Sequence, residues 1–260
     1  MTLSKLKRDG APLVVFGGIV SSKIYSLWAD LTANPDLWPM LINIQSIHRY
    51  GHGAAYYLID ELSSLLYFVT AVAFDILVFY SFVVRSEAKS RPEGAWENLF
   101  PLITVFVPVI GFTLLFFPQV REQVPDYSPE TLATLKAITP MYGFYMGMLG
   151  LTIGFTGAAL SIWALSYLKK SFGLRAAVRK LVTSGPYARI RHPLYLGEII
   201  HILGIAILSG TPVGLYLFVV AVALQVVRAR IEERKFLRTL PEYQDYMRNT
   251  GFLWPRLRWS

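Results

Sequence analysis

The sequence predicts an all-α protein that crosses a membrane about six times. Of its 260 residues, 54% are hydrophobic and 16% are charged, whereas roughly 25% of residues are charged in typical soluble domains. Several apolar stretches also approach or exceed the ~18–20 residues that span a bilayer. These observations exclude an ordinary soluble globular protein. The chain contains no cysteine, which also excludes disulfides, thiolate metal sites and a cysteine nucleophile.

The expected crossings follow from the apolar stretches and from the glycines and prolines between them. The last two are short, and the run from Ser209 to Pro212 separates them with a glycine and a proline. Such residues favour a turn, and proline suits the first turn of a following helix, so we expect a tight helical hairpin there. The six crossings are expected at residues 11–31, 62–84, 99–118, 141–168, 194–210 and 212–228.

The distribution of lysine and arginine predicts the orientation. Seven of these residues lie between Lys169 and Arg191, and eight lie between Arg228 and Arg258. Cytoplasmic loops collect lysine and arginine, so we expect an integral membrane protein with both termini and the 169–193 loop in the cytoplasm. The net charge of +8 is then explained by topology and by attraction to anionic membrane lipids. Nucleic acid is excluded as a partner on the same ground.

A row of glycines runs through the expected crossing at 141–168. Gly143, Gly147, Gly150, Gly154 and Gly157 recur at spacings of four and three residues, which places them on one face of a helix. Small residues on one face indicate close packing against another helix. A groove for a slender lipid chain is the alternative, and the same face could form a homodimer interface.

The run at 184–198 places many hydrogen-bonding groups between two apolar stretches. Its prolines, one of them directly after His192, interrupt any continuous helix. Backbone groups left unpaired near a membrane need partners in protein or in a water-filled cavity. We expect a polar ligand to supply them, with Arg191 and His192 as donors to a carboxylate and Tyr187 and Tyr195 as flat aromatic faces. A basic hinge at the interface is the alternative.

The C-terminal stretch adds an acidic pair and two tyrosines. Taken alone, Glu232 and Glu233 with the surrounding bases predict a solvated helix with ion pairs between residues four apart. The combined pattern is Gly185-Pro-Tyr-x3-Arg-His-Pro-x-Tyr-x-Gly197, then the acidic pair, then Tyr243-x2-Tyr246. In order and spacing it resembles the isoprenylcysteine carboxyl methyltransferase family, over roughly residues 165–256. It is more broadly similar to the integral-membrane methyltransferases that include the phospholipid N-methyltransferases.

This resemblance implies a methyltransferase that binds S-adenosylmethionine in a cytoplasm-facing pocket and methylates a lipophilic acceptor, such as an isoprenylcysteine-type carboxylate or another lipid. Residues 141–260 would form the methyltransferase core, and residues 1–140 would hold the N-terminal crossings. It also implies that Glu232 and Arg238 face the reaction centre as catalytic residues. The implied cofactor-binding residues are Tyr187, Arg191, His192, Pro193, Tyr195, Gly197, Glu233, Tyr243 and Tyr246.

Some polar residues depart from the family pattern. Glu198 follows Gly197 where an apolar or aromatic residue is expected, and His201 lies one turn further along the same helix. Ionisable groups inside a crossing are candidate functional sites, so this pair is interpreted as a structural hydrogen bond or as a substrate contact. Asp75 carries the same ambiguity. His48 and His52 have helical metal-ligand spacing but no third ligand, and no metal is expected.

Two other functions fit parts of the pattern. Membrane reductases of the sterol or steroid type, which use NADPH, resemble this C-terminal region, and the basic cluster that begins at Lys169 could bind their phosphate. A lipid-binding or transport module without catalysis would need a polar path through several helices. The ionisable residues instead gather toward the cytoplasmic ends, which favours an enzyme.

Overall fold

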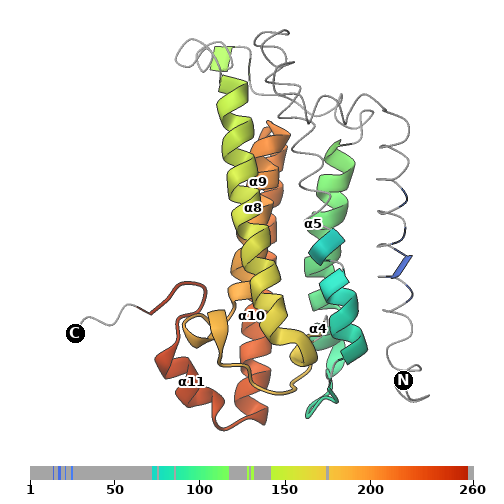
Figure 1. Cartoon of the computed structure of the whole chain (residues 1–260), viewed down its shortest axis with the longest axis vertical. Coiled ribbons are helices and arrows are strands. Elements are labelled where there is room, and N and C mark those ends of the chain that lie inside the picture. The colour runs from blue at the N-terminus through green and yellow to red at the C-terminus, as the bar shows by residue number, and fades with distance from the viewer. Residues whose placement is uncertain are drawn as a thin grey trace, which may run out of the picture.

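A computed structural model shows a bundle of helices whose long axes run in roughly the same direction (Figure 1). The described residues are 14, 17, 18, 21, 25, 72–74, 76–84, 86–116, 128, 130, 131, 142–173 and 176–256. Within them the regular structure is helical, with two isolated backbone bridges. Most of the expected crossing at 11–31 and part of the one at 62–84 lie outside the described residues, as do His48, His52 and Asp75.

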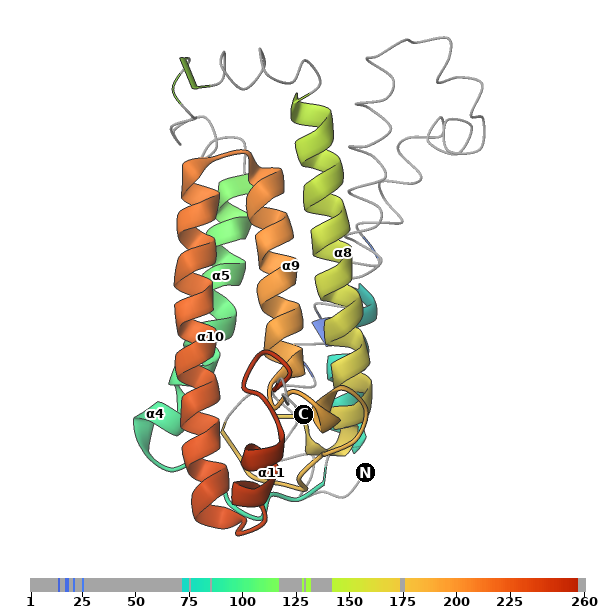
Figure 2. The same cartoon turned by 90° about the vertical axis from the view of Figure 1, so that its left-hand side faces the viewer.

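In the part of the chain that the structure describes, four long helices form the bundle. Seen from the side, α9 lies between α8 and α10, and α5 lies behind them (Figure 2). The short helices α4 (Gly94–Asn98) and α11 (Tyr243–Asn249) lie toward one end of the bundle (Figure 1). The long helices are α5 (Phe100–Phe116), α8 (Tyr142–Leu168), α9 (Pro193–Ser209) and α10 (Pro212–Thr239).

Two segments in the described part of the chain are long and apolar enough to cross a membrane. They are Tyr145–Ser171 and Pro212–Thr239, with 27 and 28 residues. Helices α5 and α9 are apolar but have 17 residues each. Six crossings therefore remain a prediction. Helix α10 continues past the expected end of the crossing at residue 228 to Thr239, as a helix with ion pairs four residues apart, such as Arg228 and Glu232 at 3.5 Å.

The glycine face of α8 packs directly on α9, which confirms the prediction of close helix packing. A Cβ atom added at Gly157 would collide with the backbone of His201, and one added at Gly150 would meet the side chain of Leu208. The contact is reciprocal, because a Cβ added to Gly204 of α9 would collide with the backbone of Gly154. The helices approach this closely because at least one of them carries a glycine at each of these crossing points.

The turn between α9 and α10 has the expected turn chemistry. Gly210 adopts the left-handed conformation with φ of 62° and ends α9. Thr211 caps the next helix, since its hydroxyl accepts a hydrogen bond from the Gly214 amide at 3.1 Å. Pro212 then occupies the first turn of α10, where its missing N–H costs nothing.

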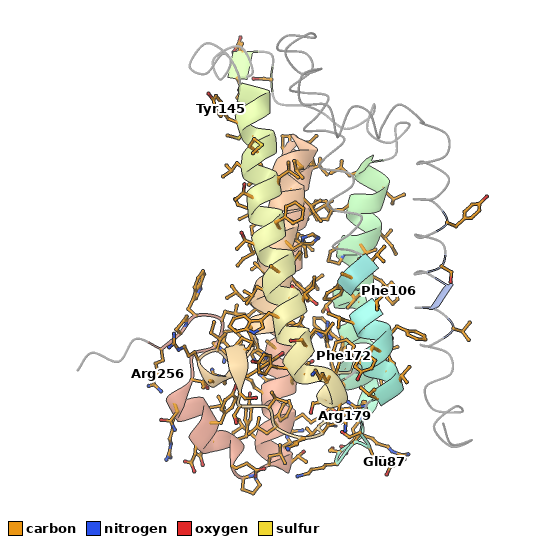
Figure 3. All side chains as sticks on the ribbon, in the orientation of Figure 1. Glu87, Phe106, Tyr145, Phe172, Arg179 and Arg256 are labelled. Carbon is orange, nitrogen blue, oxygen red and sulfur yellow. The ribbon has the colours of Figure 1, made fainter. Side chains whose placement is uncertain are left out.

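Two loops pack together at the end of the bundle where α11 lies. The amide of Val178 donates to the carbonyl of Ser90 at 3.1 Å, and the amide of Ala176 donates to that of Glu97 at 3.1 Å. Figure 3 shows Phe172 and Arg179 at this end of the molecule and Tyr145 at the opposite end of α8. A buried cluster that includes Phe82, Leu165 and Phe172 supports the loops from inside.

Candidate active site

A cavity opens at the end of the bundle that carries α11. Its walls come from the loop after α8, the start of α9, the last turns of α10, and α11. Aromatic, cationic and acidic side chains share this lining, a composition typical of sites that bind polar ligands with a flat portion. The residues that line it and carry polar or aromatic groups are Ser171, Phe172, Arg179, Lys180, Tyr187, Arg191, His192, Tyr195, Arg228, Glu232, Lys235, Phe236, Tyr243 and Tyr246.

The irregular backbone before α9 is paired by the C-terminal segment of the protein. The amide of Arg191 donates to the carbonyl of Gly251 at 2.8 Å, and the amide of His192 donates to that of Phe252 at 3.2 Å. In return, the amide of Gly251 donates to the carbonyl of Arg189 at 3.0 Å. We expected a polar ligand to satisfy this backbone. Protein satisfies these amides instead, and the segment holds the polar run in place at the cavity.

The carboxylate of Glu233 lies behind the lining, where two arginines and a histidine surround it. This carboxylate accepts from Arg191 Nε at 2.6 Å and from Arg230 Nη1 at 3.1 Å, and it lies 3.4 Å from His192 Nε2. Arg191 also donates from Nη1 to the carbonyl of Thr250 at 2.6 Å. A buried carboxylate needs such partners. Glu233 thereby fixes the orientation of Arg191 and His192 at the cavity.

A second group links α9 and α10 at the cavity wall. The hydroxyl of Tyr195 donates to Glu232 Oε1 at 2.5 Å. Arg228 Nε lies 3.5 Å from the same oxygen, and its guanidinium lies over the Tyr195 ring at 4.9 Å from the centroid. The imidazole of His192 stacks parallel to that ring at 5.4 Å. Glu232 is therefore held by a hydroxyl and a cation, which fixes its position at the cavity wall.

The tyrosines of the remaining wall stay neutral. The hydroxyl of Tyr246 donates to the carbonyl of Tyr187 at 2.7 Å, which ties α11 to the loop before α9. Burial raises the pKa of Tyr246 to about 12, although nearby Arg191 opposes the shift. Burial also raises the pKa values of Tyr187 and Tyr243 well above the usual range. These phenols thus provide neutral hydrogen-bonding groups and aromatic surface.

Two cationic side chains complete the lining, Lys235 of α10 and Arg179 of the loop after α8. Both contact the segment 86–97, which precedes α5. Buried Lys235 pairs with the carboxylate of Glu97, and Arg179 donates from Nε to the carbonyl of Ser86 at 3.1 Å. Burial acts to raise the pKa of Glu97, but the bonds from Lys235 and the Glu93 amide, together with nearby positive charge, lower that pKa overall. The N-terminal part of the chain thus supports the cavity.

Seven of the residues predicted for the site meet around the cavity: Tyr187, Arg191, His192, Tyr195, Glu232, Tyr243 and Tyr246. Arg238 is exposed and lies outside the lining. Pro193 is buried at the start of α9 and also lies outside it. Gly197 accommodates α8 rather than a ligand, because a Cβ there would meet Ser161 Oγ at 2.5 Å.

Glu198 and His201 face different neighbours. The Gln225 side chain of α10 donates to Glu198, whereas His201 Nδ1 lies 2.9 Å from the carbonyl oxygen of Gly154 on α8. These contacts therefore place His201 in a structural bond between helices. Glu198 lies one turn beyond Tyr195 along α9, outside the lining of the cavity.

Sequence reasoning missed Arg228, Lys235 and Arg179 as parts of the cavity wall. Arg228 precedes Glu232 by four residues, a spacing that places both on one helix face, and this signal could have identified it. Lys235 and Arg179 depend on contacts with residues 86–97, and no local pattern predicts those. Within the described residues, no group of three or more histidine or acidic side chains could hold a metal ion.

Comparison with known proteins gives a partial match. Residues 142–242 match the family model described as phospholipid methyltransferase. The chain is 33% identical over 113 residues to the nickel-cobalt-cadmium resistance protein NccN of Alcaligenes xylosoxydans xylosoxydans, covering 43% of this chain and 49% of that protein. It is 32% identical over 120 residues to the cobalt-zinc-cadmium resistance protein CzcN of Cupriavidus metallidurans, covering 44% and 53% respectively.

The chain thus spans about half the length of the curated relatives it matches. The motifs at 185–197 and 232–246 resemble the isoprenylcysteine carboxyl methyltransferases and, more broadly, the integral-membrane methyltransferases that include the phospholipid N-methyltransferases. The family model that matches belongs to the broader group. The match begins at residue 142, at the start of α8, and therefore includes one helix before those motifs. The narrower resemblance to isoprenylcysteine carboxyl methyltransferases stays a prediction. The match covers the start of α8 to the residues just before α11, and so includes most of the cavity wall.

Proposed function

We propose that this protein transfers a methyl group from S-adenosylmethionine to a lipophilic acceptor at the interface between membrane and cytoplasm. The observation that carries the proposal is the overlap of two independent results. The match to the phospholipid methyltransferase family covers residues 142–242, and the charged and aromatic cavity is built mostly from the same stretch. The long apolar helices next to it support a membrane setting.

The residues around the cavity suit the chemical groups of this cofactor. Its carboxylate needs a cationic donor, which Arg191 supplies. His192 Nε2 is buried without a hydrogen-bond partner of normal length in the described structure, so a ligand atom would complete its bonding. Tyr243 and Tyr246 offer aromatic surface to adenine. When bound, the cofactor supplies an electrophilic methyl group on a sulfonium.

The chain's own contribution to the reaction is orientation and charge. Glu232 is fixed by Tyr195 and Arg228, so its carboxylate can accept the proton of an acceptor hydroxyl or amine. For an acceptor that is already anionic, Arg228 offers a guanidinium donor at the wall. Holding both reactants in line can supply ~7–11 kcal/mol of the acceleration. Arg238, implied by the resemblance, would need to turn toward the cavity to act there.

The surroundings of the cavity suggest how each substrate arrives. The cofactor would enter from the cytoplasm past α11, and the acceptor would enter laterally between apolar helices. Both termini would lie on the cytoplasmic side, because the terminal segments are rich in lysine and arginine and such segments stay in the cytoplasm. The glycine face of α8 is covered by α9 of the same chain, so the expected homodimer stays a prediction without an assigned interface.

A nicotinamide-dependent reductase is not favoured, since the family that matches is a methyltransferase family. The printed names of the two relatives concern resistance to nickel, cobalt, zinc and cadmium. For this chain, a role in metal resistance would act through methylation of a membrane component.

Transfer of labelled methyl groups tests the proposal. Purified protein in lipid nanodiscs, given methyl-labelled S-adenosylmethionine and a membrane lipid extract, should place label in an extractable lipid product. Glu232→Gln should lower the rate by about 100-fold, within the usual range for general acid–base groups. Asp245→Asn, which removes an exposed carboxylate of α11, serves as the matched control and should leave the rate unchanged. Absence of lipid label with every extract would contradict the proposal.

A further inference from the structure

Glu198 is the single acidic residue of α9, a helix that is otherwise almost entirely apolar. Its side chain is partly buried, whereas its neighbour Gln225 on α10 is 4% exposed. An ionisable group among apolar helices is costly to keep and points to a ligand or a partner. The contacts of Glu198 show how many of its hydrogen-bond partners the protein itself provides.

The hydrogen bonding of this pair is incomplete in the described part of the chain. Gln225 donates from Nε2 to Glu198 Oε2, and no described residue donates to Glu198 Oε1. The other side-chain atom of the pair, Gln225 Oε1, is buried and has no partner among the described residues. Gln225 Oε1 is a hydrogen-bond acceptor, and a buried polar group without a partner costs about 1–3 kcal/mol.

The pair extends the polar wall of the cavity by one helical turn. Glu198 follows Tyr195 by three residues on α9, and Gln225 precedes Arg228 by three residues on α10. Three residues of helix rise about 4.5 Å. The pair thus lies between the cavity and the apolar middle of the bundle. The polar end of an amphiphilic molecule would occupy this position when its apolar tail lies among the helices.

We propose that Glu198 is a specificity-determining residue that binds an N–H or O–H donor on the lipophilic acceptor, with Gln225 as the residue that positions it. The inference rests on the proposed methyl transfer for the identity of the ligand as acceptor. A ligand headed by a carboxylate fits poorly, because it would add a negative charge and further acceptor atoms beside Glu198. Glu198 is also the residue that departs from the pattern of the resembling family.

Binding of simple amphiphiles tests the proposal without any turnover. Dodecylamine, dodecanol and methyl dodecyl ether share one chain and differ in the donor of the head group. Their equilibrium affinity for the purified protein in nanodiscs is measured by calorimetry. The amine and the alcohol should bind about tenfold more tightly than the ether, as expected for a hydrogen bond to a charged group. In Glu198→Gln the amine should lose this advantage, whereas Asp245→Asn should retain it.

Two outcomes would overturn the inference. Equal affinity of the wild-type protein for all three amphiphiles would do so without any variant, and so would an unchanged preference for the amine in Glu198→Gln. Binding of S-adenosylmethionine, measured on the same samples, separates this inference from the proposed function. A protein that prefers donor head groups but does not bind the cofactor would contradict the methyl transfer and leave the assignment of Glu198 intact.

Discussion

At the scale of single residues, the site depends on how each carboxylate is held. Glu232 and Glu233 are adjacent in sequence but have different surroundings. Glu233 lies behind the wall and accepts from Arg191 and Arg230, whereas Glu232 lines the cavity and accepts from Tyr195. Consecutive residues on a helix point about 100° apart, so one can orient the site while its neighbour contacts a ligand. Their roles in the site therefore differ, although their chemistry is the same.

The tie between α11 and the loop before α9 predicts a loss of stability at alkaline pH. The pKa of Tyr246 is about 12 in the folded protein and about 10 in an unfolded chain. A raised folded-state pKa gives stability that is present below the unfolded value and is lost as pH rises through the folded value. The thermal unfolding temperature of the wild-type protein should therefore fall between pH of about 10 and about 12.

Substitution isolates this effect. Tyr246→Phe removes both the titrating group and its bond to the Tyr187 carbonyl, so it should lower stability at neutral pH by about 1 kcal/mol and reduce the alkaline decline. Tyr216→Phe is a suitable control because Tyr216 is 68% exposed. An alkaline decline of equal size in wild type and Tyr246→Phe would show that this tyrosine does not cause it.

At the scale of elements, the α8–α9 interface supports the site. Gly157, Gly197 and Gly204 allow the two backbones to approach at points where any side chain would collide. Helix α9 begins at the cavity with His192 as its N-cap, so a shift of α9 against α8 would move His192 and Tyr195 together. Helix packing and site geometry are therefore coupled through one short helix.

A larger side chain at the interface between α8 and α9 should disturb both the helix packing and the geometry of the site. Gly157→Leu would force α8 and α9 apart, and we expect a loss of about 3 kcal/mol, at the upper end for an overpacked core. Ala159→Leu is the matched control, since Ala159 is exposed on the same helix. Thermal unfolding in detergent gives the comparison. Equal stability of the two variants would contradict the packing described here.

The sequence predicted the elements better than it predicted their contacts. The expected ends of the crossings at 141–168 and 194–210 lie within one residue of α8 and α9, because glycine, proline and apolar periodicity are local signals. The charged residues after the expected end of the last crossing at 228 were predicted to form a helix with ion pairs, and α10 indeed runs on to Thr239.

For the site as well, the sequence predicted local motifs but not long-range contacts. Tyr187, Arg191 and His192 belong to one motif, and their place at the cavity was expected from sequence. Lys235 was not expected there, because its partner Glu97 is 138 residues away in the chain. Such long-range ion pairs have no local pattern. Glu198 was identified as a departure from the family, but its partner Gln225 could not be predicted without the packing of α9 on α10.

At the scale of the whole molecule, the protein combines an apolar bundle with a polar cavity at one end. The family match covers α8 to the end of α10, while α5 and the loop before it lie outside the match. That outer part still contacts the site, since Thr104 of α5 lies 3.4 Å from Arg228 and Glu97 pairs with Lys235. We therefore expect the N-terminal part to influence the choice of acceptor.

Equilibrium binding of S-adenosylmethionine to the purified protein in nanodiscs tests the central claim most directly. The wild-type protein should bind the cofactor in competition with its demethylated product. Glu233→Gln should weaken binding by about tenfold or more, because Arg191 and His192 lose the carboxylate that orients them. Asp245→Asn should bind like the wild type. No measurable binding by the wild-type protein, or equal affinity in Glu233→Gln and Asp245→Asn, would contradict this account.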